Sequence, residues 1–450
     1  MFSKILIANR GEIARRVIRT CNRLGIQTVA IFSEADADSL YVKEANEAYC
    51  IGKPPVNQSY LNIEEILLTA KRSGAEAIHP GYGLLSENAD FARRCEKEGI
   101  VFIGPNPEII ASMGSKIEAR KTMKEAGVPI IEGIDASIET EEEALVAAQE
   151  IGYPLMLKAS AGGGGIGMQL VTSDEELIKA FSGNKKRAES FFGDGAMFIE
   201  KYIEEPHHIE VQIIADTHGN IVPLWERECS IQRRNQKVVE EAPSPYVNES
   251  TRNALLDAAV RAAKHIGYTN AGTIEFLVDR EQNFYFLEMN TRLQVEHPVT
   301  EEITGLDLVE EQIKVASKEA LTFTREEVCR KGHAVEVRIY AEDPITFFPS
   351  PGKISGLKLP IGEGIRNECG VEKGSQVTPF YDPMIAKLIA WGKNREDACK
   401  RLEAALLNYE ITGIKTNVPM LLRVVSHEQF LLGNTTTQFV NQYYLPSFSN

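Results

Sequence analysis

Five polar residues at alternate positions form the most informative stretch of the chain. They are Glu288, Asn290, Arg292, Gln294 and Glu296. Because alternate side chains of an extended chain share one face, that face would carry two carboxylates, two neutral amides and one guanidinium. A site that holds a metal ion, an anion and a proton acceptor needs this mixture. The simpler alternative is a half-exposed edge strand with a solvated polar face.

Geometry restricts how this stretch can fold. In a fully extended chain, Glu288 and Glu296 would lie roughly 26 Å apart, which is too far for one reaction centre. We therefore expect the chain to bend after Asn290. Residues 284–290 are predicted to form a strand, and residues 292–298 a loop that folds back over the same site.

A predicted hairpin over residues 273–290 supplies candidate metal ligands. It brings Glu275 and Glu288 into the same sheet, with Asn290 two residues further on. Carboxylate and amide oxygens are suitable ligands for Mg²⁺. Two facing carboxylates repel each other unless a cation intervenes, which favours a metal site over simple solvation of the strand pair.

A glycine run, Gly162 to Gly165 followed by Gly167, lies between two hydrophobic segments. Glycine lets backbone amides approach an anion closely, so the run is typical of a phosphate-covering lid between two strands of a hairpin. A flexible turn without a ligand is the alternative. The order of residues is not that of a Walker A loop. Lys158, on the preceding strand, could reach phosphates or extend into solvent.

Two further polar segments have both a structural and a functional interpretation. In residues 197–216, Glu200, Lys201 and Ile203 follow an apolar strand at whose edge a nucleotide base could bind. His208 begins the next strand, where a single histidine is usually structural. Residues 228–245 combine basic and acidic side chains. They predict either a salt-bridged surface loop or an anion pocket that contains Lys237.

Composition limits the class of protein. The 450 residues are enough for several domains or subdomains, and the net charge of −15 makes the chain a poor ligand for nucleic acid or an anionic membrane. There is no apolar run of 18 residues, so no transmembrane helix is expected. The short apolar stretch near the N-terminus does not resemble a signal peptide. Seven cysteines without a CxxC pair indicate a reducing cytoplasm.

The first third of the chain alternates strands and helices, which predicts a parallel sheet with ligands at the carboxyl ends of its strands. Residues 9–12 and 79–83 stand at two such ends, without a GxGxxG pattern. A second unit begins near Met113 with a helix over residues 116–127. After a connection at residues 322–332, the last region contains short strands, turns and a helix over residues 395–409.

With these residues in place, the chain resembles the biotin carboxylase family of the ATP-grasp superfamily. The resemblance covers essentially the whole chain. It rests, in order, on ILIANRGEIA, HPGYGLLSEN, MGSK, KASAGGGGIGM, EKYIEEPHHIEVQ, QRRNQKVVEEAPSP, FLEMNTRLQVEHPVTE, VEVRIYAEDP, YDPMIAKL and GIKTNV. It implies an α/β fold, α+β in parts, with three domains: a parallel-sheet domain at residues 1–113, an ATP-grasp domain at 114–330 with a mobile glycine-rich lid at about 130–203, and a C-terminal mixed β domain at 331–450.

The resemblance also implies a reaction. MgATP, with Mn²⁺ as the alternative ion, would drive carboxylation of biotin by bicarbonate through carboxyphosphate. The product would be N1′-carboxybiotin on a biotinylated carrier protein. This is the first half-reaction of a biotin-dependent carboxylase, and acetyl-CoA carboxylase in fatty acid synthesis is the expected system. A carboxyltransferase would be the other partner, the chain would form a homodimer in the cytoplasm, and neither nucleic acid nor a membrane would be bound.

The family's site residues carry over to matching positions. Bicarbonate would be held by Lys237, Arg292, Gln294 and the Val295 backbone, with Glu296 as general base. Arg338 would stabilise the biotin oxygen, and Tyr82 would pack near biotin. The metal would be bound by Glu275 and Glu288, with Asn290 beside them. The nucleotide residues would be Lys116, Lys158, Gly163, Gly164, Gly165, Gly167, Met168, Glu200, Lys201, Ile203, His208, Gln232, Asn235 and Leu277.

Three positions depart from the family pattern. The lid usually reads GGGGGRGM, whereas Ala161 and Ile166 replace its first glycine and its arginine here. Asn235 stands where the family has histidine, and its amide can still bind a ribose hydroxyl. No biotinylation motif of the MKM type and no carboxyltransferase-sized extension are present, which suggests a separate biotin carboxylase subunit.

Other functions are compatible with parts of this pattern. A different ATP-grasp ligase, such as half of a carbamoyl phosphate synthetase, would not depend on biotin. A non-catalytic nucleotide-binding subunit would bind ATP without bicarbonate-dependent turnover. Within the biotin-dependent enzymes, a subunit of another acyl-CoA carboxylase or of pyruvate carboxylase is the alternative, because the acyl acceptor is chosen by the carboxyltransferase.

Overall fold

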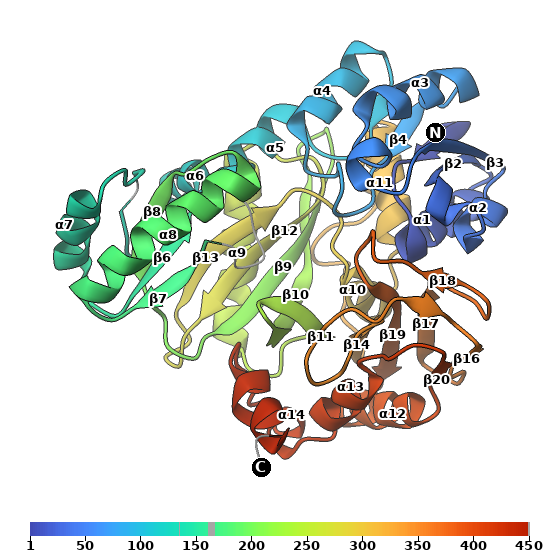
Figure 1. Ribbon diagram of the computed structural model, residues 1–450. Coiled ribbons are helices and arrows are strands. Elements are labelled where there is room, and N and C mark those ends of the chain that lie inside the picture. Colours follow the sequence, from blue (N-terminus) through green and yellow to red (C-terminus); the bar gives the residue numbers. More distant parts are fainter. Residues whose placement is uncertain (135, 161–166, 449–450) are drawn as a thin grey trace.

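The computed structural model describes residues 1–134, 136–160 and 167–448. The chain has the predicted mixed α/β architecture. Figure 1 shows an N-terminal sheet on one side of the molecule and a three-stranded sheet with two helices on the other, with a large sheet between them. No helix in the described part of the chain is long and apolar enough to cross a membrane.

The N-terminal sheet is parallel, as the alternation of strands and helices predicted. Its strand order is β3-β2-β1-β4-β5. The apolar strand β1 is buried between helices because both faces of a parallel sheet are covered. The strands are β1 (Lys4–Ile7), β2 (Gln27–Ser33), β3 (Glu47–Gly52), β4 (Ala77–His79) and β5 (Val101–Phe102), and the helices are α1 (Gly11–Arg23), α2 (Leu40–Glu44), α3 (Ile63–Ser73), α4 (Ala89–Lys97), α5 (Pro107–Gly114) and α6 (Lys116–Glu125).

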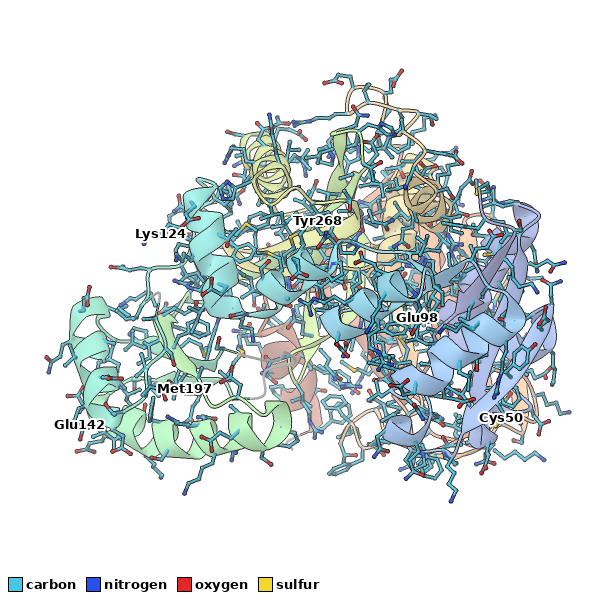
Figure 2. All side chains as sticks on the ribbon, turned by 90° about the horizontal axis from the view of Figure 1, so that it is seen from above. Cys50, Glu98, Lys124, Glu142, Met197 and Tyr268 are labelled. Atoms are coloured by element: carbon cyan, nitrogen blue, oxygen red, sulfur yellow. The ribbon has the colours of Figure 1, made fainter. Side chains whose placement is uncertain are left out.

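A small outlying unit, called here the three-stranded unit, follows α6. Its antiparallel strands have the order β7-β6-β8 and pack against two helices. The first helix begins with a capping box between Thr140 and Glu143, which stabilises its N-terminus. Figure 2 places Glu142 of this helix and Cys50 of β3 at opposite ends of the molecule. The unit contains β6 (Leu155–Ala159), β7 (Gln169–Val171), β8 (Met197–Lys201), α7 (Glu141–Ile151) and α8 (Asp174–Phe192).

One antiparallel sheet of eight strands forms the centre of the molecule, in the order β13-β12-β9-β10-β11-β14-β19-β17. Apolar residues of α9 (Glu249–His265) pack on one face of it. The opposite face carries the polar residues described below. The strands are β9 (His207–Ala215), β10 (Ile221–Arg233), β11 (Gln236–Ala242), β12 (Asn270–Val278), β13 (Phe284–Asn290), β14 (His333–Tyr340), β17 (Ile365–Cys369) and β19 (Met384–Gly392).

The remaining elements surround this sheet. Short strand pairs β15–β18 and β16–β20 and the helix α12 confirm the predicted character of the last region. The residues between 322 and 332 contain no helix or strand and form the predicted connection. The elements are α10 (His297–Thr304), α11 (Leu308–Ala316), β15 (Gly352–Lys353), β16 (Gly356–Lys358), β18 (Gln376–Val377), α12 (Arg395–Leu407), β20 (Glu410–Thr412), α13 (Val418–Val425) and α14 (Glu428–Leu431).

Two local expectations differ from the structure. The charged segment at residues 228–245, for which a surface loop was one prediction, is largely the hairpin of β10 and β11. Arg234 and Asn235 form its turn with positive φ, a conformation that asparagine adopts more readily than most residues. His297 and Pro298, expected in the folded-back loop, are instead the first residues of α10, where proline is favourable.

Candidate active site

The polar residues found by alternation divide between the edge strand β13, which carries Glu288 and Asn290, and the loop between β13 and α10. Glu275 of β12 stands in register between Glu210 of β9 and Glu288 of β13. Further along the sheet, Arg338 of β14 is paired with Lys387 of β19. All residues of β9 are buried, so its alternating polar side chains point into the molecule. Buried charges at this density require partners of opposite charge or a ligand.

Lys237 lies at the meeting point of three carboxylates. Its Nζ is 2.6 Å from Glu210 Oε2, 2.7 Å from Glu275 Oε1 and 2.8 Å from Glu296 Oε1. Burial opposes the charge of the ammonium, but the three carboxylates outweigh burial and raise the pKa of Lys237 well above its ordinary value. Lys237 is therefore a fixed cation that can transfer one of its bonds to an incoming anion.

Glu296 is completely buried and is held by two cations. Its Oε1 accepts from Lys237, and its Oε2 accepts from Arg338 Nη2 at 3.0 Å. Burial opposes ionisation, but Lys237, Arg338 and Arg227 outweigh it, so the pKa of Glu296 lies well below its usual range. Glu296 is thus a carboxylate at neutral pH, as a proton acceptor must be. Because it is a weak base, proton transfer to it must be coupled to a second step.

Arg338 connects this centre with an open cavity. Its Nε donates to Glu240 Oε1 at 2.6 Å. Burial raises the pKa of Glu240 to about 7, against the opposing effect of Arg338. A cavity of about 500 Å³ is lined by Arg338 together with Tyr82, Arg292 and Val295. A small molecule in this cavity would therefore meet a guanidinium beside the Glu296 carboxylate.

The bend predicted after Asn290 is present. The strand β13 ends at Asn290, whose Nδ2 donates to Glu275 Oε1 at 2.8 Å. The chain then turns back, so that Gln294 Nε2 donates to the same oxygen at 3.0 Å. Residues that are far apart in an extended chain therefore contact one acceptor, which supports a single site.

Arg292 is fixed by polar groups on several sides. It donates to Gln294 Oε1 at 2.7 Å and to Asn290 Oδ1 at 2.9 Å. Its Nε also donates to Glu87 Oε2 at 2.8 Å, and Glu87 accepts a bond from the Thr291 backbone at 3.0 Å. The residues at positions 80–88 of the N-terminal unit thus reach the site through Glu87.

The candidate metal ligands form a facing pair of carboxylates. Burial and the Glu275 carboxylate raise the pKa of Glu288. Burial would also raise the pKa of Glu275, but Lys237 and His208 outweigh it and lower this pKa. His208 Nε2 lies 2.6 Å from Glu275 Oε2, and Gln232 Nε2 lies 2.8 Å from His208 Nδ1. The carboxylates and the nearby Asn290 amide are oxygen donors of the kind that suits Mg²⁺.

A pocket of about 210 Å³ lies between the three-stranded unit and the large sheet. Its walls combine apolar side chains, such as Ile131 and Phe198, with many polar and charged ones. It brings together most of the residues that the resemblance assigns to the nucleotide. These are Lys116, Lys158, Met168, Glu200, Lys201, Ile203, His208, Gln232, Asn235 and Leu277, with Glu275 and Glu288 at the same pocket.

Some polar groups of this pocket are bonded to the protein. The Lys158 ammonium contacts the Glu200 carboxylate, which also accepts from Arg120 Nη1 at 3.0 Å. Lys201 Nζ donates to the carbonyls of Gly152 at 2.8 Å and Tyr153 at 3.1 Å. A nucleotide base beside Lys201 would therefore meet the backbone of Lys201. To bind a phosphate, the Lys158 ammonium would have to exchange the Glu200 carboxylate for it.

The strands on either side of the glycine run form the predicted hairpin, because β6 and β7 pair antiparallel. Gly163, Gly164 and Gly165 lie outside the described residues. Gly167 has a φ of +74°, and a Cβ there would come within 2.9 Å of the Ala159 Cβ. The structure therefore requires glycine at position 167, whatever ligand the run covers.

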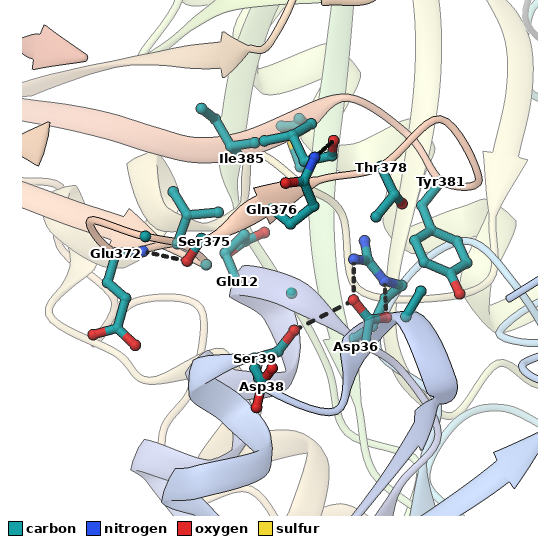
Figure 3. Close-up of a pocket in the computed structure, with 18 of the residues that line it drawn as sticks. Glu12, Asp36, Asp38, Ser39, Glu372, Ser375, Gln376, Thr378, Tyr381 and Ile385 are labelled. Carbon is teal, nitrogen blue, oxygen red and sulfur yellow. Dashed lines mark hydrogen bonds and ion pairs between the residues drawn. The ribbon is translucent and has the colours of Figure 1, made fainter. Parts of the chain in front are cut away.

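A second cavity of about 320 Å³ adjoins the one beside Arg338. Figure 3 shows it between the start of α1 and the segment around β18, with Glu12, Asp36 and Gln376 among the lining residues. Glu12 and Tyr381 line both cavities. The cavity beside Arg338, called here the substrate cavity because the resemblance assigns its residues Arg338 and Tyr82 to biotin, is thus bounded by the N-terminal unit on one side and by the C-terminal region on the other.

Sequence reasoning missed several charged residues of this site. Glu87, Glu210, Glu240 and Arg227 were not assigned roles. The completely buried Arg227 donates to Gln212 Oε1 at 2.7 Å and also contacts Glu210. The alternation of polar residues along β9 could have indicated Glu210. Glu87 has no such local signal, because only the tertiary fold brings it to Arg292.

A pocket with lysine and carboxylate residues beside a buried carboxylate and cation centre, built on this fold, defines an ATP-dependent ligase of the ATP-grasp class. Family models agree along the chain. They are the N-terminal domain of biotin carboxylase at residues 1–110, the ATP binding domain of the carbamoyl-phosphate synthase L chain at 115–324, and the biotin carboxylase C-terminal domain at 336–442.

Individual biotin-dependent carboxylase proteins are also similar in sequence to this chain. Biotin carboxylase 2 of Bacillus subtilis is 63% identical over 98% of this chain and 100% of its own length. A pyruvate carboxylase subunit of Methanothermobacter thermautotrophicus is 53% identical over 98% of this chain and 90% of its own length. The chain belongs to the biotin carboxylase family.

Two solved structures are also similar over nearly the full length of both chains. One is the biotin carboxylase domain dimer of the 2-oxoglutarate carboxylase of Hydrogenobacter thermophilus, in complex with MgADP, ADP and bicarbonate. It has 50% identity and a TM-score of 0.96, and 98% of each chain is covered. The other is the complex of Campylobacter jejuni biotin carboxylase with β-γ-ATP, at 46% identity and a TM-score of 0.97, which covers 98% of this chain and 99% of that one.

Proposed function

We propose that the chain carboxylates biotin on a carrier protein with bicarbonate, through carboxyphosphate, and releases ADP and phosphate. The observation that carries this proposal is the position of Glu296 between Lys237 and Arg338. On one side of this centre lies the pocket with the predicted nucleotide residues, and on the other lies the cavity with Tyr82. An anion held at Lys237 would therefore lie between two substrate sites.

The residues of the centre suit the handling of bicarbonate. Lys237 and Arg292 would bind the anion, with the Gln294 side chain and the Val295 backbone completing its contacts. Bicarbonate becomes a stronger nucleophile when it loses a proton, and Glu296 is placed to accept that proton. The low pKa of Glu296 means that the transfer must proceed together with attack on a phosphoryl group, which removes the charge as it forms.

Arg338 has a separate task in this proposal. When biotin loses its N1′ proton, negative charge develops on the ureido oxygen. A fixed guanidinium directed at such a charge stabilises it without having to reorganise. Arg338 is held by Glu240 and Glu296 and lines the cavity, so it is fixed in advance. Tyr82, which lines the same cavity, would pack against biotin.

The donor set at Glu275, Glu288 and Asn290 fits a divalent cation. Its fit rests on the pairing of the buried Glu275 with the half-buried Glu288. Burial and the Glu275 carboxylate raise the pKa of Glu288, and a cation would relieve the repulsion between the two carboxylates. Glu275, Glu288 and Asn290 would hold Mg²⁺ or Mn²⁺, which would neutralise negative charge during phosphoryl transfer. Lys116 and Lys158 would hold the phosphates, and Leu277 and Ile203 would contact the base.

The wider assignment follows from the family. We propose three domains at residues 1–113, 114–330 and 331–450, a homodimer, and a biotinylated carrier and a carboxyltransferase as partners. The proposed location is the cytoplasm, where the seven free cysteines stay reduced. A solved relative described as a biotin carboxylase domain dimer supports the homodimer.

The first test is bicarbonate-dependent ADP release from MgATP, with and without high free biotin. We expect release that biotin stimulates and that disappears in Glu296→Ala. Release that biotin does not change would indicate another ATP-grasp reaction. ATP binding without release would indicate a non-catalytic protein.

Acetyl-CoA is the proposed final acceptor, in fatty acid synthesis. The resemblance described above is the basis for acetyl-CoA, and the 53% identity to a pyruvate carboxylase subunit supports pyruvate as the alternative. Reconstitution with carrier and carboxyltransferase pairs from the same cell would decide between them. Malonyl-CoA formation would support acetyl-CoA, and oxaloacetate formation would support pyruvate.

A further inference from the structure

Lys387 is a fully buried lysine that the proposed reaction does not use directly. It lies on β19, next to Arg338 in the register of the sheet, and its exposed fraction is 0%. A lysine ammonium is strongly hydrated in water, so burying one requires good acceptors. The acceptors of Lys387 belong to two other parts of the chain.

The first acceptor is the backbone of the folded-back loop. Lys387 Nζ donates to the carbonyl oxygen of Val295 at 2.7 Å. Val295 lines the cavity beside Arg338, and its neighbours Gln294 and Glu296 contact Glu275 and Lys237. One bond from Lys387 therefore fixes the backbone at the point where the proposed general base and the bicarbonate ligands meet.

The second acceptor is Glu12, which contacts Tyr82 in the wall of the same cavity. Lys387 Nζ lies 3.3 Å from Glu12 Oε1, and the Tyr82 hydroxyl contacts the same carboxylate oxygen. The ammonium also lies 5.8 Å from the centre of the Tyr82 ring. Glu12 is 4% exposed, and its Oε2 has no hydrogen-bond partner among the described residues. Its charge is therefore balanced mainly by Lys387.

We propose that Lys387 is a positioning residue for carboxylation, because one ammonium fixes both the Val295 carbonyl and, through Glu12, the Tyr82 hydroxyl. This inference rests on the proposed function. Glu12, Tyr82 and Val295 line the substrate cavity, whereas Lys387 lies behind them. It would keep the loop that contains Val295 and the side of the cavity that contains Tyr82 at a constant separation. A compact ammonium with three donors suits this task, because it can serve two acceptors at once.

A purely stabilising role makes a different prediction, and a pair of substitutions separates the two. Lys387→Met alone leaves the Glu12 carboxylate buried without its cation. This change by itself can lower stability, so a loss of activity in the single variant would not separate the two roles. Lys387→Met with Glu12→Gln removes both charges. Glutamine at position 12 can still accept from the Tyr82 hydroxyl, whereas Val295 loses its donor. The exposed pair Lys358 and Glu410 of the C-terminal region provides the matched control, Lys358→Met with Glu410→Gln.

The experiment compares wild type, the double variant and the control by melting temperature and by biotin-dependent ADP release. We expect the double variant to melt close to wild type while its kcat falls about ten- to a hundredfold, because small misplacements of reacting groups have effects of this size. The KM for bicarbonate should rise and the KM for ATP should stay unchanged. The control should match wild type in every measurement.

Two results would overturn the inference while the proposed function stands. One is a double variant with wild-type kcat and wild-type KM for bicarbonate. The other is a parallel loss of stability, ATP affinity and turnover, which would show a structural role only. If wild type itself shows no biotin-dependent release, the proposed function fails, and this inference fails with it.

Discussion

The two halves of the site are built in different ways. Around Lys237 and Glu296, charged side chains of the sheet are bonded to one another and to Glu296, which directly precedes α10. The proposed nucleotide pocket instead combines apolar side chains with lysines, carboxylates and amides, and it lies between the large sheet and the three-stranded unit. The charged centre is preorganised for chemistry, whereas the pocket is suited to binding. Substitutions in the centre should therefore change turnover, and substitutions in the pocket should change ATP affinity.

The largest effect is expected at Glu296. Replacing it by glutamine, which has nearly the same shape, removes the proton acceptor but keeps two polar atoms near Lys237 and Arg338. Biotin-dependent ADP release should fall about 10²–10³-fold. The Kd of ATP, measured by calorimetry, should change by less than about twofold, because Glu296 does not line the nucleotide pocket. A loss of ATP affinity as large as the loss of ADP release would show that the two halves of the site do not act independently.

Arg338→Gln should have a smaller and more selective effect. Loss of the guanidinium should lower biotin-dependent turnover about 10²-fold, while the slow ATP cleavage without biotin continues. The ratio of ADP release with and without biotin is the measurement. Arg423→Gln on the exposed side of α13 is the control. Equal loss of both activities would place Arg338 in bicarbonate activation and not in biotin deprotonation.

On the binding side, Lys158→Met should raise the Kd of ATP about tenfold, the size expected for one charge-assisted bond. Turnover at saturating ATP should change less. Lys185→Met, which removes an ion pair with Glu139 on the surface of the three-stranded unit, serves as the control. A large fall in kcat with unchanged Kd would contradict the assignment of Lys158 to binding.

The smallest effect concerns Glu240 and the pH dependence of stability. Burial raises its pKa to about 7 in the folded state, above the ordinary carboxyl value. The folded protein therefore keeps a proton that the unfolded chain releases, and this contribution to stability is lost as pH rises from about 4.5 through 7. Glu240→Gln should reduce the fall in melting temperature between pH 5 and pH 8 by about one or two degrees. An identical fall in both proteins would contradict this.

Much of this arrangement could be predicted from the sequence, because alternation and strand pairing are local properties. The pairing of Glu275 with Glu288 and the bend after Asn290 follow from the period of two and from the length of an extended chain. The family resemblance predicted which residues bind the nucleotide, and most of these residues line one pocket of the structure.

What could not be predicted depends on contacts between distant segments. Glu87 reaches Arg292 from a loop more than two hundred positions earlier. Lys387 looks like an ordinary charge between apolar residues, and only the fold shows that it binds Val295 and Glu12. The charged segment at residues 228–245 has the composition of a surface loop. Only the fold shows that Arg233, Glu240 and Glu241 are buried and bonded to residues of distant segments.

The most direct test of this account is to measure carboxylated biotin itself. Wild-type protein would be incubated with MgATP, biotin and radiolabelled bicarbonate, and acid-labile label on biotin would be counted beside ADP. The account predicts label that forms in step with ADP in wild type and that is absent in Glu296→Gln, although this variant still binds ATP. ADP formation without label on biotin in wild type, or undiminished label in Glu296→Gln, would contradict it.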